Sequence, residues 1–172
     1  MTRMQNQILK RILKLFPENF RNTISLRYFG FTKIPMLFFT RPSVVALTAD
    51  RIVIKIPFRR RTKNHLGSMY FGALSAGADC AAGLYAMNLI QKRSEHILLI
   101  FKDLKAEFLK RAEGDVYFHC DQGREIANLV AEAAQSDERV DMSIHVEAKV
   151  PSQCDDPVAR FTLTLSLKKK PL

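Results

Sequence analysis

The most informative stretch of the chain is N-H-L-G-S-M-Y-F-G-A-L-S-A-G-A-D-C-A-A-G, residues 64–83. Asp79 is the only Asp, Glu, Lys or Arg between Lys63 and Lys92. A helix expected over residues 69–90 is therefore apolar on nearly every face, as helices in a protein core or a membrane are. We reject a membrane span, because an acid in its middle is costly in lipid.

Small residues indicate how this helix packs. They are Gly72, Ala73, Ser75, Ala76, Gly77, Ala78, Cys80, Ala81, Ala82 and Gly83. A glycine inside a helix costs up to about 1 kcal/mol relative to alanine. We therefore expect a compensating gain from a curved sheet that approaches the helix closely.

Apolar and polar side chains alternate with period two in the C-terminal part of the chain, as in an antiparallel sheet with one face in water. Such a sheet needs a helix to cover its apolar face. The sequence thus predicts an α+β fold, with a curved antiparallel sheet wrapped around the long central helix and a peripheral helix over residues 123–135. The expected strands are residues 44–48, 52–56, 97–109, 116–120, 140–150 and 161–168.

The net charge of +10 is concentrated in residues 1–42, interpreted as an N-terminal extension of a domain over residues 43–172. From Met1 to Arg41, eight basic residues stand against one acid. A basic surface attracts the phosphates of nucleic acids, anionic lipids and nucleotides alike. Nucleic acid is not expected as a partner, because the charge is not interleaved with aromatic residues.

Two segments of the extension have different patterns. The pattern of residues 4–16 predicts an amphipathic basic helix, which either makes peripheral contact with an anionic membrane or packs on the surface of its own domain. Residues 24–42, interrupted by Pro35 and Pro42, are expected to be irregular and to wrap the domain or border a pocket.

The cysteines, the histidines and the N-terminal residues argue against several classes of protein and site. The three cysteines are widely spaced and form no C-x-x-C pair, which argues against a disulfide framework and fits a cytoplasmic protein. The four histidines lack the spacing of metal ligands, so no metal site is expected. We expect no secretory signal at the N-terminus.

Asp79 is the leading candidate for chemistry. A carboxylate in apolar surroundings should have a raised pKa or a partner. It is either a structural cap or ion pair, or a general base or nucleophile at a pocket or subunit boundary. The free N–H groups at the start of the same helix, near Phe71 and Gly72, would stabilise the oxyanion formed from a thioester carbonyl.

The residues Asn64, Gly67, Ser68, Gly72 and Asp79 fall in register with the motif of hotdog-fold thioesterases of the phenylacetate-degradation (PaaI-like) type, which residues 43–168 resemble. The chain looks closest to a branch related to the C-terminal half of YiiD-type proteins. The resemblance implies a hotdog fold and a homodimer or dimer of dimers with its sites at the subunit boundary. It also implies hydrolysis of an acyl-CoA or acyl-carrier thioester, with coenzyme A as part of the substrate and no separate cofactor.

The resemblance also implies roles for individual residues. Asp79 activates water or attacks directly, Asn64 positions water or the carbonyl, and the backbone N–H of Phe71 holds the carbonyl oxygen. The family's His-Gly pair is replaced by Tyr70-Phe71. Tyr70 is a candidate catalytic residue because it can donate a hydrogen bond, but tyrosine is a poor general base near pH 7. The alternative is therefore a protein that binds acyl-CoA or lipid without hydrolysing it.

Three further residues have open roles. His65 borders the motif and is a candidate for orienting the substrate. Lys110 takes the place of the family's polar Ser or Thr near the end of the central strand. Lys110 and Arg111, like residues 59–63, either contact coenzyme A phosphates or are solvated charges at strand ends.

Overall fold

The computed structural model describes residues 16–93 and 96–170 of the 172-residue chain. The helices are α2 (Glu18–Lys33), α3 (Pro35–Thr40), the short 3-10 helix η1 (Arg60–Thr62), α4 (Phe71–Arg93) and α5 (Gly123–Gln135). The strands are β1 (Ser43–Leu47), β2 (Ile52–Ile56), β3 (Ile97–Phe108), β4 (Val116–Cys120), β5 (Val140–Val150) and β6 (Cys154–Lys169).

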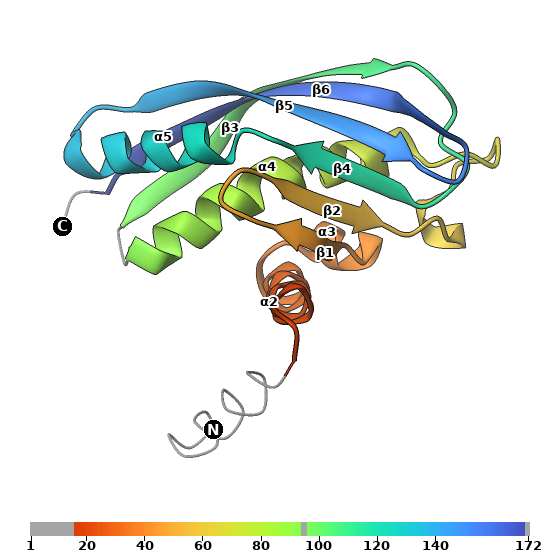
Figure 1. Cartoon of the computed structure of the whole chain (residues 1–172), viewed down its shortest axis with the longest axis horizontal. Helices are drawn as coiled ribbons and strands as arrows, with labels where there is room; N and C mark the ends of the chain where they lie inside the picture. The colour runs from red at the N-terminus through yellow and green to blue at the C-terminus, as the bar shows by residue number, and fades with distance from the viewer. Residues whose placement is uncertain (1–15, 94–95, 171–172) are drawn as a thin grey trace.

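The strands form one antiparallel sheet in the order β1-β2-β4-β5-β6-β3. The sheet curves around α4, as Figure 1 shows, and this arrangement is the hotdog fold that the sequence predicts. β3 lies at one edge, so Lys110 follows an edge strand of this chain and not a central one, contrary to the expectation from the sequence. It would follow a central strand only if the sheets of two chains joined at this edge.

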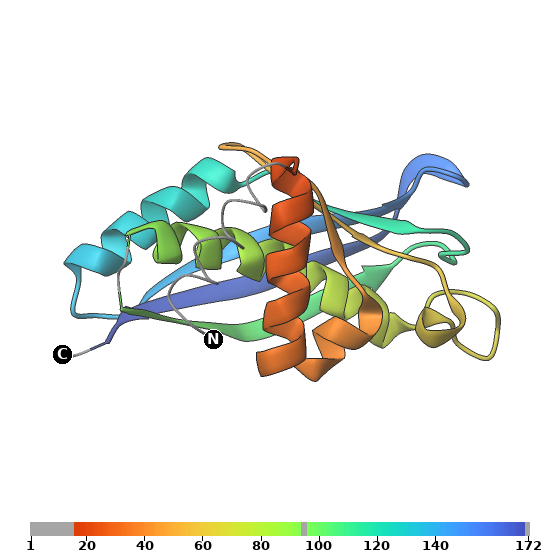
Figure 2. The ribbon, with the colours of Figure 1, turned by 90° about the horizontal axis from the view of Figure 1, so that it is seen from below.

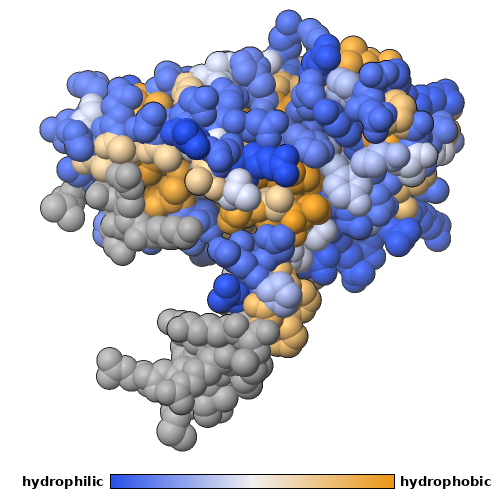
Figure 3. Space-filling model, viewed as in Figure 1, coloured by the Kyte–Doolittle hydropathy of each residue, from blue (hydrophilic) through white to orange (hydrophobic). Residues whose placement is uncertain are grey.

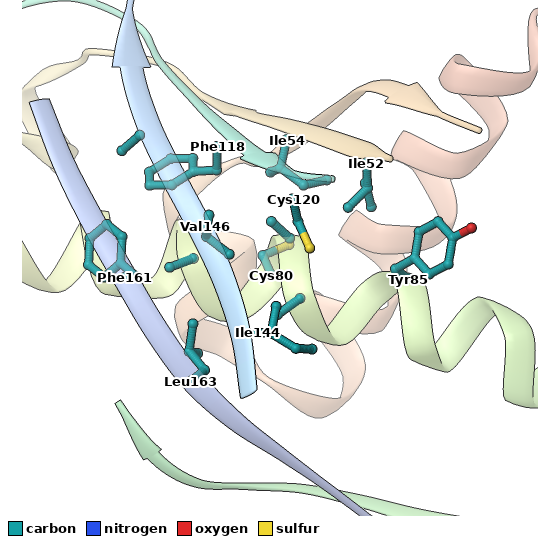
Figure 4. Packing of buried hydrophobic residues seen from close by; sticks show 14 of the residues in the cluster. Ile52, Ile54, Cys80, Tyr85, Phe118, Cys120, Ile144, Val146, Phe161 and Leu163 are labelled. Carbon is teal, nitrogen blue, oxygen red and sulfur yellow. The ribbon is translucent and has the colours of Figure 1, made fainter. Parts of the chain in front are cut away.

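The close approach expected between α4 and the sheet is confirmed. A Cβ atom on Gly77 would lie 2.2 Å from the ring of Phe118 on β4, so only glycine fits there. Ala78, Ala81 and Ala82 of α4 are completely buried in the same core. Figure 4 shows Cys80 of α4 among the side chains that the sheet sends toward the helix. No helix in the described part of the chain has the length and apolarity needed to cross a bilayer.

The expectation that residues 24–42 are irregular is wrong. They lie almost entirely in α2 and α3, because Leu26 and Leu37 become buried against the core and stabilise helices that local propensity does not favour. In Figure 2, α2 crosses in front of α4 on the open side of the sheet. The helix predicted over residues 4–16 lies outside the described residues.

Candidate functional site

Asp79 lies in the wall of an apolar pocket with a volume of about 430 Å³, which we call the Asp79 pocket. Leu26 and Phe29 of α2, Leu37 of α3, and Met87 of α4 line it, together with residues 97–101 of β3. Asp79 is the only charged side chain among the described lining residues. The pocket is in the size range of small-molecule sites and offers one ionisable group in an otherwise apolar wall.

The electrostatics of Asp79 follow from this position. Burial raises the pKa of its carboxyl above the ordinary value of 3.8, and no hydrogen bond or charge from the described residues offsets that burial. The first part of the expectation for this residue, a raised pKa, is therefore confirmed. A carboxyl without a structural partner favours the chemical role over the structural one.

The start of α4 offers the hydrogen-bond donors expected near Phe71 and Gly72. The carbonyl of Tyr70 accepts from the N–H groups of Ala73 at 2.9 Å and Leu74 at 3.1 Å. Within the described residues, the N–H groups of Phe71 and Gly72 have no backbone acceptor. They are thus free to bind an oxyanion.

The loop before α4 is fixed largely by Asn64. Its Oδ1 accepts from the N–H groups of Leu66 at 2.9 Å and Ser68 at 3.2 Å, and its Nδ2 donates to Ser68 Oγ at 3.1 Å. Gly67 has φ of 80°, which favours glycine and closes the turn. The described contacts of Asn64 therefore shape the loop that leads into α4.

Aromatic rings connect the start of α4 to the edge strand. The ring of Tyr70 lies against Gly72, because a Cβ atom on Gly72 would be 2.5 Å from Tyr70 Cε1. The centroids of the Tyr70 and Phe71 rings are 4.7 Å apart. The centroid of the Phe71 ring lies 6.5 Å from that of Phe108, the last residue of β3. Tyr70 and Phe71 are both exposed at this edge of the sheet.

The other predicted binding residues lie apart from the Asp79 pocket lining. Lys110 Nζ forms an ion pair with Asp156 at 2.9 Å, and this hydrogen bond raises the pKa of the Lys110 ammonium. The Arg111 side chain is exposed, while its backbone carbonyl accepts from Gln153 Nε2 at 3.1 Å. His65 is exposed in the loop before α4.

The sequence interpretation missed individual pocket residues in α2 and α3, although it expected the segment to border a pocket. Leu26 and Leu37 were not recognised, because the helices that present them were not expected. The signal was available in part: Glu18 follows Pro17 at one end, and Lys33 precedes Pro35 at the other, as at helix termini.

The fold is shared with solved structures of low sequence identity. A Chlorobaculum tepidum protein of unknown function has a TM-score of 0.75 at 13% identity, covering 88% of this chain and 97% of that chain. A Pseudomonas aeruginosa protein of unknown function, described as a probable thioesterase, has a TM-score of 0.67 at 22% identity, covering 86% of this chain and 96% of that chain. A Haemophilus influenzae thioesterase has a TM-score of 0.61 at 14% identity, covering 84% of this chain and 88% of that chain.

A family model described as a domain of unknown function, DUF4442, matches residues 25–167. The chain therefore belongs to the DUF4442 family, and it shares the hotdog fold with these solved structures. None of the curated proteins compared with the chain matches it. The narrower resemblance to PaaI-like and YiiD-type proteins stays a prediction.

Proposed function

We propose that this chain hydrolyses an acyl thioester whose acyl chain lies in the Asp79 pocket. The observation that carries the proposal is an unpaired carboxyl of raised pKa in the wall of an apolar pocket. The apolar lining suits an aliphatic acyl group, and the carboxylate suits a base or nucleophile beside its carbonyl carbon. The thioesterase name of the Haemophilus influenzae neighbour supports the same reaction class.

Two chains are needed to complete the site. Phe71 and Asp79 are eight residues apart on α4, which corresponds to about 12 Å along the helix axis. A single carbonyl group therefore does not touch both the free N–H groups at the helix start and the carboxylate of the same chain. A second copy would bring its own helix start to Asp79.

The edge strand β3 suits this pairing. Leu98, Ile100, Leu104 and Phe108 are exposed along it, and an exposed apolar edge strand is a template for pairing with another chain. Phe71 lies near Phe108, and Gly83, one turn beyond Asp79, lies near Phe101. An antiparallel pair of β3 strands centred near residues 104–105 would thus place the helix start of one chain beside Asp79 of the other.

The proposed reaction follows from these groups. Asp79 accepts a proton from water while the water oxygen bonds to the thioester carbon, and the carbonyl oxygen becomes an oxyanion held by the N–H groups of Phe71 and Gly72. The intermediate then collapses and the carbon–sulfur bond breaks. The proton passes to the leaving sulfur, and the products are a carboxylic acid and a thiol.

A specific observation favours the alternative, binding of acyl-CoA or lipid without turnover. The side chain of Asn64, expected to position water or the carbonyl, is hydrogen-bonded within its own loop. Phe71 is 59% exposed and bulky where a substrate carbonyl would approach.

Hydrolysis assays over acyl-CoA substrates of increasing chain length distinguish the two functions. The wild type should release coenzyme A, and Asp79→Asn should lower kcat by about 10²–10⁴-fold, the contribution of a positioned general base. Glu113→Gln, a matched change at an exposed acid, should leave the rate unchanged. Tight binding with no turnover above the Asp79→Asn background would contradict the enzymatic function.

A further inference from the structure

The helix α2 has an apolar stripe that faces away from the core. Phe20, Ile24, Tyr28 and Phe31 recur at helical spacing and are 47%, 39%, 69% and 65% exposed. Its opposite face, which includes Leu26, is buried. In Figure 3, orange and tan side chains gather on the underside of the domain, around α2 and α4. A helix with one face in the core and an exposed apolar stripe on another face has a surface suited to contact with a membrane or another protein.

Arginines form a pocket next to this stripe. Arg27, Arg41, Arg59, Arg60 and Arg61 line a depression of about 730 Å³ together with Pro57. Within the described residues, none of these arginines forms an ion pair with an acid. Five guanidinium groups, none in a direct ion pair with an acid of the described residues, make a positive hollow that suits phosphate groups.

Direct contacts join the stripe to the arginines. The rings of Phe31 and Phe38 lie 5.2 Å apart, which links α2 to α3. The guanidinium of Arg61 lies 5.4 Å from the ring centre of Phe39, and its Nη1 donates to the Phe39 carbonyl at 3.4 Å. The apolar stripe, α3 and the arginine pocket therefore form one surface, which we call the basic-aromatic face.

We propose that the basic-aromatic face docks on an anionic lipid bilayer. Aromatic side chains would enter the boundary between head groups and acyl chains, and the arginines would bind lipid phosphates. Charge complementarity selects this occupant, because an apolar protein partner would leave five arginines unpaired. The proposal goes beyond hydrolysis, since it concerns the surface on which the protein works.

The other face of the same helices gives the docking a consequence. Leu26 and Phe29 of α2 and Leu37 of α3 line the Asp79 pocket. Docking through the outer face would hold the wall of this pocket at the lipid surface, where long-chain acyl groups partition.

Vesicle flotation of the full-length protein tests the proposal. We expect binding to vesicles of phosphatidylcholine and phosphatidylglycerol, weak binding to phosphatidylcholine alone, and loss of binding at high salt. Replacing two arginines, Arg59→Gln with Arg60→Gln, should lower the partition coefficient by about 30-fold. Replacing Tyr28→Ser with Phe31→Ser should also lower it. The matched charge change Lys169→Gln with Lys170→Gln should have a much smaller effect, and thermal unfolding checks that every variant is folded.

Three results would overturn the proposal. One is equal binding to neutral and anionic vesicles. Another is loss of binding on changing Lys10→Gln with Arg11→Gln but not on changing Arg59 and Arg60, which would assign the contact to the N-terminal segment. The third is a change of oligomeric state in the Tyr28 and Phe31 variant with unchanged vesicle binding, which would make the face a contact between copies.

Discussion

Gly77 of α4 and Phe118 of β4 fit together so closely that a Cβ atom on Gly77 would lie 2.2 Å from the Phe118 ring. This contact sets the distance between the central helix and the middle of the sheet. It also explains why the helix tolerates a glycine that weakens it locally. The position of Asp79, two residues later on the same helix, depends on this packing.

Replacing Gly77 with alanine should destabilise the protein. The added methyl group would force Phe118 or the helix to shift, and such overpacking typically costs about 1–3 kcal/mol. Urea unfolding measures the change in the free energy of unfolding. Gly83→Ala is the control, because its Cβ would lie 3.4 Å from Phe101, in ordinary contact, and its stability should stay within about 1 kcal/mol of wild type. Equal losses for both variants would contradict the packing argument.

Replacing Asp79 with asparagine should stabilise the protein at neutral pH. Burial raises the pKa of the Asp79 carboxyl above 3.8, so the folded state binds a proton more readily than the unfolded state. Above the raised pKa, the buried Asp79 carboxylate is charged and its full cost lowers the free energy of unfolding. As the pH falls from there toward 3.8, Asp79 becomes protonated in the folded state, and its contribution to the free energy of unfolding should therefore increase. The advantage of Asp79→Asn over wild type should shrink across the same window. Chemical unfolding at a series of pH values checks this, and a constant difference would show that burial does not perturb Asp79.

Filling the Asp79 pocket should shorten the acyl chain that is accepted. Met87 lines the pocket, and Met87→Trp would occupy part of the volume that an acyl chain needs. We expect kcat/KM for long-chain substrates to fall by about 10–200-fold per methylene excluded, while short-chain substrates are little affected. Leu66→Trp, in the exposed loop before α4, is the control. A uniform fall for all chain lengths would place the acyl group elsewhere.

A charge on the edge strand should prevent dimer formation. Leu104 is 43% exposed on β3, and Leu104→Glu would place two carboxylates close together near the proposed two-fold axis. Light scattering after gel filtration should show the monomer, with hydrolysis reduced to the level of Asp79→Asn. Leu66→Glu, which adds the same charge away from β3, should stay dimeric and active. An active monomer would show that one chain suffices.

The strands were predictable because burial alternates along them. Ile144, Val146 and Ala148 of β5 are fully or almost fully buried, and polar residues stand between them. The central helix was predictable because one acid stands in a long apolar run. These signals are local and repeat along the chain, so they can be identified without knowing what packs against them.

Helix α2 was not predictable by the same reasoning. Its residues Thr23, Ile24, Tyr28 and Gly30 have modest or poor helix propensity, so the helix depends on packing against the core. For the same reason, Arg27 and Arg41 could not be grouped with residues 59–61, which the fold brings into one pocket. Asp79 could be predicted because it is the one charged residue in an apolar stretch of the sequence. The walls of its pocket could not be predicted, because they come from segments that are far apart in the sequence.

Complementation between two inactive variants tests the shared site most directly. Asp79→Asn removes the base, and Phe71→Pro removes the N–H donor at a helix position that tolerates proline. In a purified heterodimer of the two variants, one site carries both changes and the other carries neither. We predict that this heterodimer recovers about half the activity of the wild-type dimer. A heterodimer as inactive as its two parents would contradict the proposal that Asp79 of one chain works with the helix start of the other.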